Sequence, residues 1–296
     1  MPIPSLRPLG FGEILDGAFS LYRRNFGPFV LTALVPSIAL LAGGLLYASA
    51  LSSFVRGGGN PAAAATAILG PLLLFIVLTA LATLVSWGAL TRQAAQAFTG
   101  APVSVPDGLK AGLRALFPML GAAFLAGLVV LVVGGVVGFV SAIFMMVMGA
   151  IGVIVMTLAI LAVYMLAITI FAGVAPAVVV EGKGPLSALT RSWDLVSGAL
   201  GRTMGLVVVS VLIAYMPVIA VMFVTGTTGM MAGPSSAAAM PGAGALIAQQ
   251  VLAWIAGVLT TPFMVSVFVL TYFDRRVRTE ALDVQVMTDS LAPAAQ

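Results

Sequence analysis

The sequence contains no cysteine and no histidine. The absence of cysteine excludes disulfides, thiolate nucleophiles and cysteine-ligated zinc or iron–sulfur sites. The absence of histidine removes the most common general base and the most common metal ligand. Many catalytic chemistries are therefore excluded before any motif is considered, and we expect neither a metal nor a cofactor.

Charge is also scarce. Only 7% of the 296 residues are charged and 61% are hydrophobic, and the mean hydropathy of the chain is +1.18. An ordinary soluble domain has roughly 25% charged residues. A water-soluble globule of this composition would expose apolar surface almost everywhere. The composition therefore predicts an integral membrane protein.

The charges lie in clusters, and the uncharged stretches between them measure the membrane spans. The first two stretches hold 31 and 35 residues, and two later stretches hold 66 and 71. A helix needs about 20 residues to cross the hydrocarbon core, so a short stretch holds one span and a long stretch holds two. The sequence predicts an all-α, polytopic membrane bundle with six transmembrane helices. We place these helices near 28–50, 68–90, 117–140, 150–173, 204–224 and 246–272, with a turn in 141–152.

The basic residues predict the orientation of the bundle. With six spans, twelve of the thirteen lysines and arginines fall on one face, and only Arg56 falls on the other. Lysine and arginine accumulate in the cytoplasmic loops of membrane proteins. We therefore expect both termini to lie in the cytoplasm.

Segments with helical periodicity precede the first, third and fifth predicted spans. They cover 11–26, 104–116 and 185–200, and in each one apolar residues recur every three or four positions while the charges take other faces. This pattern is typical of amphipathic helices at the level of the lipid headgroups. We predict three amphipathic interfacial helices on the cytoplasmic side.

The order of these elements suggests internal repetition. An interfacial helix followed by a hairpin would recur in 9–90, 104–173 and 184–272. The alternative is that any loop entering a membrane tends to be amphipathic. We predict a single transmembrane domain over 1–280, followed by a short cytoplasmic tail at 281–296.

The predicted spans carry no Asp, Glu, Lys or Arg at membrane depth. Ionisable groups inside a membrane are typical of proton relays, ion coupling and intramembrane catalysis. Their absence argues against a proton-driven pump and against an intramembrane protease with two carboxylates. Gly134 and Gly138 form a G-x-x-x-G pair, a pattern that lets helices approach closely in lipid but does not identify a partner.

Acids and bases mix at the cytoplasmic boundary of the predicted bundle. The residues that we single out there are Arg23, Arg24, Glu181, Arg191, Asp194, Asp274, Arg275, Arg276, Arg278 and Glu280. We expect Glu181 and Asp194 to pair with arginines of this set, which would tie the third interfacial helix to the end of the sixth span. The alternative is that these arginines bind anionic lipid headgroups, at about 1 kcal/mol per basic residue.

Three ordered motifs carry a resemblance to a known family. They are RPLGFGEILD with LYRRNF in 7–26, P…EG…P…AL…RSW in 176–193, and YFDRRVRTE in 272–280. The chain resembles the bacterial glycerophosphoryl diester phosphodiesterase membrane domain-like family, although Thr279 and Ala281 flank Glu280 where Arg and Gly are usual. The resemblance implies a six-helix membrane domain, which some members fuse to a catalytic barrel. Such a barrel would use histidine and acidic metal ligands, so we expect no catalytic barrel here.

These observations favour a non-enzymatic protein of a bacterial plasma membrane that acts as a scaffold or regulator in envelope or lipid homeostasis. The alternative is a transport component for an apolar or lipid-like solute. A lipid-sized cavity at mid-membrane would favour transport, and a close-packed bundle would favour a scaffold. The expected partners are membrane lipids with anionic headgroups and another protein or a second copy of the chain, and not nucleic acid.

Overall fold

The computed structural model of the protein describes residues 7–56, 61–225 and 242–281, which form helices joined by short connections and contain no strand. The helices are α1 (Phe11–Arg24), α2 (Phe26–Arg56), α3 (Pro61–Phe98), α4 (Val105–Met148), α5 (Ala150–Ala172), α6 (Val174–Glu181), α7 (Pro185–Ser197), α8 (Leu200–Val224) and α9 (Ala243–Glu280). The predicted all-α class agrees with this architecture.

Six stretches are long and apolar enough to cross a membrane. They cover Phe26–Ser53, Thr66–Phe98, Val105–Met148, Ile151–Glu181, Leu200–Val224 and Ala243–Glu280. Each overlaps one predicted span, so the number and order of the spans are confirmed. The helices are longer than predicted because loss of hydrophobicity marks where a chain leaves lipid and does not itself end a helix. For example, α3 continues past position 90 to Phe98, and Gly100 then adopts a positive φ of 75°.

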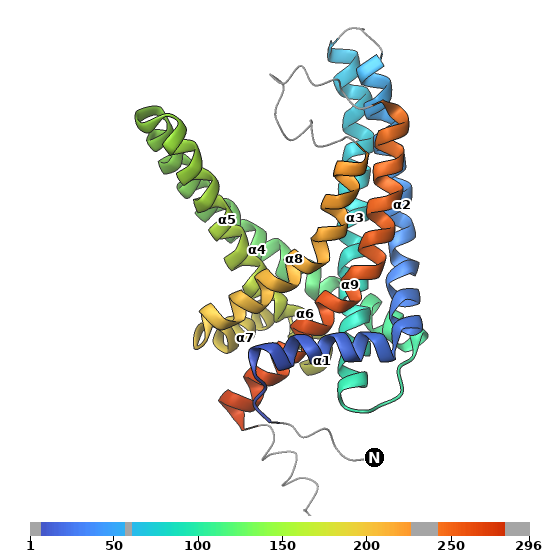
Figure 1. Cartoon of the computed structure of the whole chain (residues 1–296), viewed down its shortest axis with the longest axis vertical. Helices are drawn as coiled ribbons and strands as arrows, with labels where there is room; N and C mark the ends of the chain where they lie inside the picture. Colours follow the sequence, from blue (N-terminus) through green and yellow to red (C-terminus); the bar gives the residue numbers. More distant parts are fainter. Residues whose placement is uncertain (1–6, 57–60, 226–241, 282–296) are drawn as a thin grey trace, which may run out of the picture.

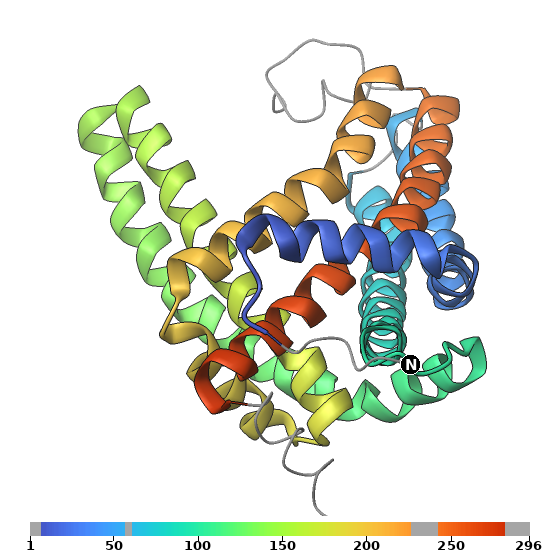
Figure 2. The ribbon, with the colours of Figure 1, turned by 60° about the horizontal axis from the view of Figure 1, so that its bottom comes forward.

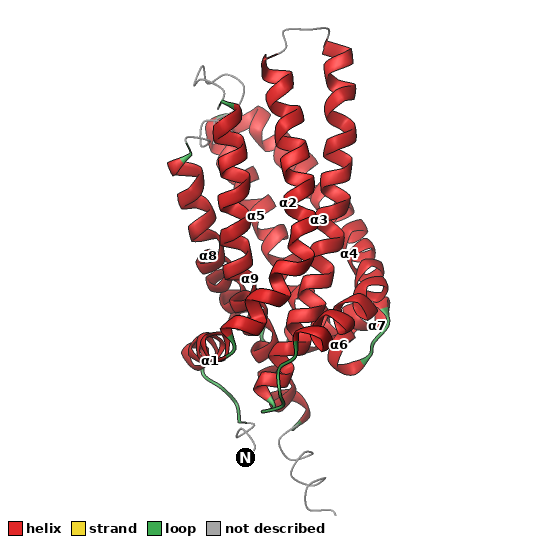
Figure 3. Ribbon diagram, turned by 90° about the vertical axis from the view of Figure 1, so that its right-hand side faces the viewer, coloured by secondary structure: helices red, strands yellow, loops and turns green. Residues whose placement is uncertain are grey.

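The long helices are arranged in two parts. Figure 1 shows α2, α3 and α9 standing side by side, while the hairpin of α4 and α5 leans away from them. Helix α8 packs along α9, and α1 lies across one end of the bundle, as the view from that end also shows (Figure 2). In the side view of Figure 3, α1, α6 and α7 gather at this same end.

Helix α9 forms the centre of the larger part. Its residues from Pro262 to Phe273 are all buried, and Val267, Val269 and Leu270 are at most 2% exposed. They pack with buried residues of α1, α2, α3 and α8 in one apolar cluster. A second cluster around Met119 joins α3, α4, α6 and α7. The core therefore lies around α9 and toward the end that holds the short helices.

Two of the three predicted interfacial segments form separate short helices, α1 and α7. The prediction of a separate helix over 104–116 is wrong, because α4 runs without a break from Val105 through Pro118 into the span. The change from charged to apolar residues after Arg114 marks the entry into lipid, and no helix-ending residue accompanies it. A proline inside a helix removes one backbone hydrogen bond and can bend a helix without ending it. The threefold repetition stays a prediction.

The connections around α5 differ from the predicted ones. The expected turn in 141–152 shortens to Gly149, whose φ of +56° lets α4 continue to Met148. After α5, the expected loop contains the short helix α6, which Gly173 separates from α5. Helix α6 ends at Gly182, which is in the left-handed region with a φ of 67°. The backbone N–H groups of Gly182 and of the next residue donate to carbonyls of α6 and close this end of the helix.

Candidate functional site

The candidate site lies at the end of the molecule formed by α1, α6, α7 and the last turns of α9, which we call the charged end (Figures 1 and 3). The ion pairs found in the described part of the chain all lie there. They form two networks that both include α9, and a separate exposed pair between Arg7 and Glu13.

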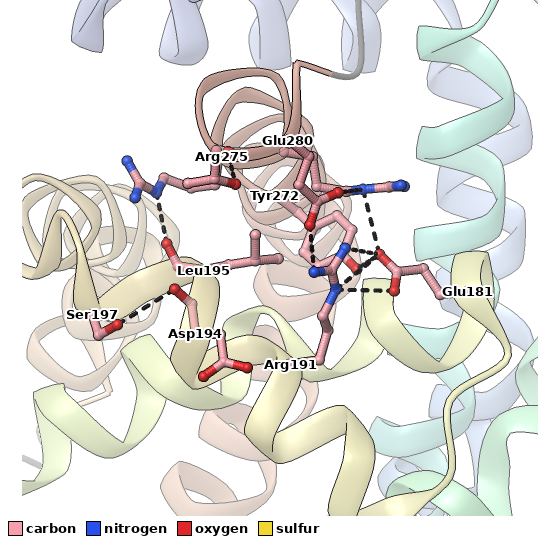
Figure 4. A network of polar contacts seen from close by, with 10 residues as sticks. Glu181, Arg191, Asp194, Leu195, Ser197, Tyr272, Arg275 and Glu280 are labelled. Atoms are coloured by element: carbon pink, nitrogen blue, oxygen red, sulfur yellow. Dashed lines mark hydrogen bonds and ion pairs between the residues drawn. The ribbon is translucent and has the colours of Figure 1, made fainter. Parts of the chain in front are cut away.

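The first network joins α6, α7 and α9. Arg191 donates two hydrogen bonds to Glu181, with Nη2 at 2.9 Å from Oε1 and Nε at 3.0 Å from Oε2, and it also pairs with Glu280. Arg276 Nε lies 3.0 Å from Glu280 and 3.4 Å from Glu181. The Tyr272 hydroxyl donates to Glu181 as well. Figure 4 shows Arg191 between the two carboxylates.

The electrostatics of this network are balanced. Two carboxylates and two guanidinium groups cancel, and the side chains of Arg191 and Glu181 are only 23% and 13% exposed. Hydrogen bonds to Glu280 and Glu181 raise the pKa of Arg191 above its ordinary value. A planar guanidinium that binds carboxylates with two parallel bonds fixes geometry as well as charge. The network therefore fastens three helices and leaves little net charge for a ligand.

The second network fastens the N-terminal segment to α8 and α9. Asp274, whose side chain is 1% exposed, accepts from Arg202 Nη1 at 3.1 Å and from Arg278 Nε at 3.0 Å. The Leu9 N–H also donates to Asp274 at 2.8 Å, and the Leu9 carbonyl accepts from both arginines. One buried carboxylate thus organises the start of α1 against two membrane-spanning helices.

Four residues of the predicted set lie outside these networks. Within the described residues, Asp194 makes no ion pair, so the expectation that it pairs with an arginine is wrong. Its carboxylate points away from the network in Figure 4, and only its backbone carbonyl accepts a bond, from Ser197. Arg275 donates instead to the Leu195 carbonyl at 2.7 Å.

The remaining two are Arg23 and Arg24, in the last turn of α1, which form no ion pair with any residue that the structure describes. Asp194 lies three positions after Arg191 and therefore near the same face of α7, but its side chain is exposed and makes no ion pair with a described residue. The sequence analysis did not assign Arg202 or the hydroxyl of Tyr272 to this site. The spacing of four from Tyr272 to Arg276 to Glu280, and from Asp274 to Arg278, was the available signal, because such residues share a helix face.

A cavity of about 310 Å³ lies within the bundle, between α2, α3, α8 and α9. Its lining is largely apolar and includes hydroxyl and amide groups of Ser37, Ser86, Tyr215, Gln250 and Thr260. No carboxylate, lysine or arginine lines it. Pockets that bury drug-sized ligands hold about 300–1,000 Å³, so this cavity fits a small molecule or part of a lipid chain.

The described residues contain no group of three or more Asp or Glu side chains placed to hold a metal ion. The charged end is thus built from arginine–carboxylate pairs, and the interior of the bundle from apolar and uncharged polar side chains. Together with six helices able to span a bilayer, these features define a multi-pass membrane protein.

Comparison with known proteins places the chain in a family. Residues 12–275 match the model of a domain of unknown function, DUF7847, and the chain belongs to this family. The match covers all six spans except the last turn of α9. Searches of curated proteins and of solved structures find no match.

Proposed function

We propose that the protein is a non-enzymatic scaffold or regulator in a bacterial plasma membrane, with both termini in the cytoplasm and a role in envelope or lipid homeostasis. The three motifs at 7–26, 176–193 and 272–280 support a relationship to the glycerophosphoryl diester phosphodiesterase membrane domain-like family. The observation that carries the scaffold proposal is the exposure of the α4–α5 hairpin.

Away from the charged end, the hairpin has little contact with the rest of the chain. In the most apolar stretches of α4 and α5 only 6% of the residues are buried. Met146 and Val147 near its tip are 86% and 79% exposed, and Phe139 is 70% exposed. Because lipid tails are as apolar as these side chains, nothing in the bilayer drives the hairpin back onto the bundle.

The glycines of α4 support a protein partner for this surface. A Cβ added to Gly127, Gly134, Gly135 or Gly138 would meet nothing within 4 Å. Glycine in a helix interior costs about 1 kcal/mol relative to alanine, and helices in membranes use glycine where backbones come close. Within the described chain no helix uses these four positions. We therefore infer that a transmembrane helix of another protein packs against α4.

In-cell photo-crosslinking tests this proposal. A photoreactive amino acid replaces Phe139 on the hairpin, and a second variant carries it at Leu73 of α3, a control that is 60% exposed. We expect a protein adduct from position 139 and only lipid adducts from position 73. Lipid adducts alone from both positions would contradict the scaffold proposal. Mass spectrometry of the adduct distinguishes a second copy of this chain from another protein.

The orientation has a separate test, because the chain lacks native cysteine. Ser53→Cys, at the end of α2 remote from the charged end, should react with an impermeant thiol reagent in intact cells. Ser187→Cys, in α7, should react only after the membrane is permeabilised. The reverse pattern would overturn the proposed orientation.

The second candidate function is transport of an apolar or lipid-like solute, which the 310 Å³ cavity favours. Ala214→Trp would fill this cavity from α8, and Ala162→Trp, at an exposed position of α5, provides a control for added bulk. A co-purifying lipid or apolar molecule that is lost only from the Ala214→Trp variant would support transport. Equal retention in both variants would count against it.

A further inference from the structure

A second and larger cavity, about 550 Å³, lies at the charged end, apart from both ion-pair networks. The end of α3, the beginning of α4 and the connection from α6 to α7 form its walls. Four basic side chains line it, those of Arg92, Lys110, Arg114 and Lys183, together with the single carboxylate of Asp107. We call this cavity the basic pocket.

The basic pocket differs from the networks in its unbalanced charge. Its four basic residues and one acidic residue leave three net positive charges, and all five residues are exposed. Among the described residues none of the five takes part in an ion pair, whereas Arg191, Arg202, Arg276 and Arg278 all have carboxylate partners. Like charges gathered in a concave surface repel one another, and an anion would relieve that repulsion.

The fold brings these bases together through a close approach of α3 and α4. A Cβ on Gly112 would lie 2.3 Å from the Val85 carbonyl oxygen, so the two backbones nearly touch. This contact places the end of α3, with Arg92, beside the first turns of α4. Lys110 and Arg114 are four positions apart and therefore share one face of α4. The basic cluster is thus built on two tightly packed helices.

The fourth base comes from a different part of the chain. Gly182 ends α6 in the left-handed conformation, with a φ of 67°, and reverses the chain so that Lys183 joins the pocket. An apolar wall of Ala115, Pro118 and Val178 completes the lining on the side where α4 enters its span. The pocket therefore combines a cationic part with an apolar part.

We infer that the basic pocket binds a phosphate-bearing group. Guanidinium groups match the geometry of phosphate oxygens, and lysine contributes compact positive charge to the same ligand. The volume lies within the range of ligand pockets and exceeds the need of a single inorganic phosphate. The phosphate can come from an anionic lipid headgroup, whose chains would follow the apolar wall, or from a soluble phosphate compound. The basic pocket and the hairpin surface involve different residues, so phosphate binding is independent of the scaffold proposal and is tested separately.

Native mass spectrometry of the full chain, released from nanodiscs of phosphatidylglycerol and phosphatidylcholine, tests the lipid source. The test variant is Lys110→Gln/Arg114→Gln. The control is Arg23→Gln/Arg24→Gln, which removes the same charge from exposed positions at the same end of the molecule but outside the pocket. Attraction to an anionic membrane surface contributes about 1 kcal/mol per basic residue and would lower lipid binding in both variants. If the pocket binds the headgroup, the test variant should lose at least ten-fold of its bound phosphatidylglycerol and several-fold more than the control, whose two arginines line no pocket. An equal loss from both variants would overturn a lipid site in this pocket.

Titration with pyrophosphate in neutral detergent, after lipid removal, tests the soluble source with the same two variants. Selective loss of pyrophosphate binding in the test variant, with no selective lipid effect, would assign the pocket to a soluble phosphate compound. If neither phosphatidylglycerol nor pyrophosphate binding changes selectively, the inference is wrong.

A third variant is expected to bind more of the phosphate probe, so that its effect cannot be explained by loss of folding. Asp107→Asn removes the only acid of the pocket and should increase binding of the same probe about five-fold. Misfolded protein cannot give such a gain. Unchanged or weaker binding by Asp107→Asn, in protein that keeps its thermal midpoint, would contradict the inference.

Discussion

Helix α9 and the α4–α5 hairpin are both membrane-spanning, yet they stand at opposite extremes of burial. Half of the most apolar stretch of α9 is buried within the chain, against 6% for α4 and for α5. The buried helix is nevertheless the less hydrophobic one. Water drives apolar residues inward in a soluble protein, but lipid accepts them on the surface. In this protein, high hydrophobicity therefore identifies the helices that face lipid, and polar side chains identify the central one.

The largest effect on stability is expected from the loss of Asp274, the buried carboxylate of α9 in the second network. Asp274→Ala would leave Arg202, Arg278 and the Leu9 N–H without their shared acceptor. Removing one partner from a buried ion pair costs about 3–5 kcal/mol, so the free energy of unfolding in detergent should fall by that order. Chemical denaturation measures the change.

The matched control for this variant is Asp194→Ala, an exposed carboxylate without an ion pair among the described residues. It should change stability by less than about 0.5 kcal/mol. Similar losses from both variants would show that the second network does not hold α9 in place.

Two glycines of α4 allow the packed and the exposed part of one helix to be compared. Gly112→Ala would push a methyl group into the Val85 carbonyl and the backbone of Ala89, and overpacking of this kind costs about 1–3 kcal/mol. Gly134→Ala meets open space and improves helix propensity by up to about 1 kcal/mol. Thermal unfolding in detergent should therefore lower the midpoint of the first variant and keep or raise that of the second. A lower midpoint for Gly134→Ala would mean that the chain itself packs against the hairpin glycines.

An effect smaller than the loss of Asp274 is expected from the coupling between Glu181 and Arg191. The two share a bidentate contact, and neighbours of this kind show interaction energies of about 0.5–3 kcal/mol. The stability loss of Glu181→Ala/Arg191→Ala should therefore be smaller than the sum of the two single losses. Strict additivity would indicate that Glu280 and Arg276 hold α7 without help from Glu181.

Prediction from sequence succeeded where the bilayer imposes the pattern. Uncharged stretches longer than a span must cross or lie in lipid, so the number and order of the six helices follow from the charges alone. The end of a helix needs a different signal. The change from charged to apolar residues after Arg114 marks the entry into lipid, and α4 continues through it. The pairing of Asp274 with Arg278 has a helical spacing that sequence can reveal, whereas its contacts to Arg202 and Leu9 depend on how α1 and α8 cross α9.

The basic pocket was beyond sequence analysis for the same physical reason. Arg92, Lys110 and Arg114 are spread over the ends of two helices, and Lys183 lies far along the chain. They converge only because Gly112 lets α3 and α4 touch and Gly182 reverses the chain after α6. In the sequence, these bases are indistinguishable from any cytoplasmic loop charges of a membrane protein.

The central claim is that packing around α9 stabilises the fold, while the α4–α5 hairpin binds a transmembrane helix of another protein. The most direct test combines Gly134→Leu with the photoreactive residue at position 139, and records the adduct in cells and the thermal midpoint in detergent. We predict that the protein adduct disappears while the midpoint stays within a few degrees of that of the parent. An unchanged adduct, or loss of the adduct together with a collapse of the midpoint, would contradict the claim.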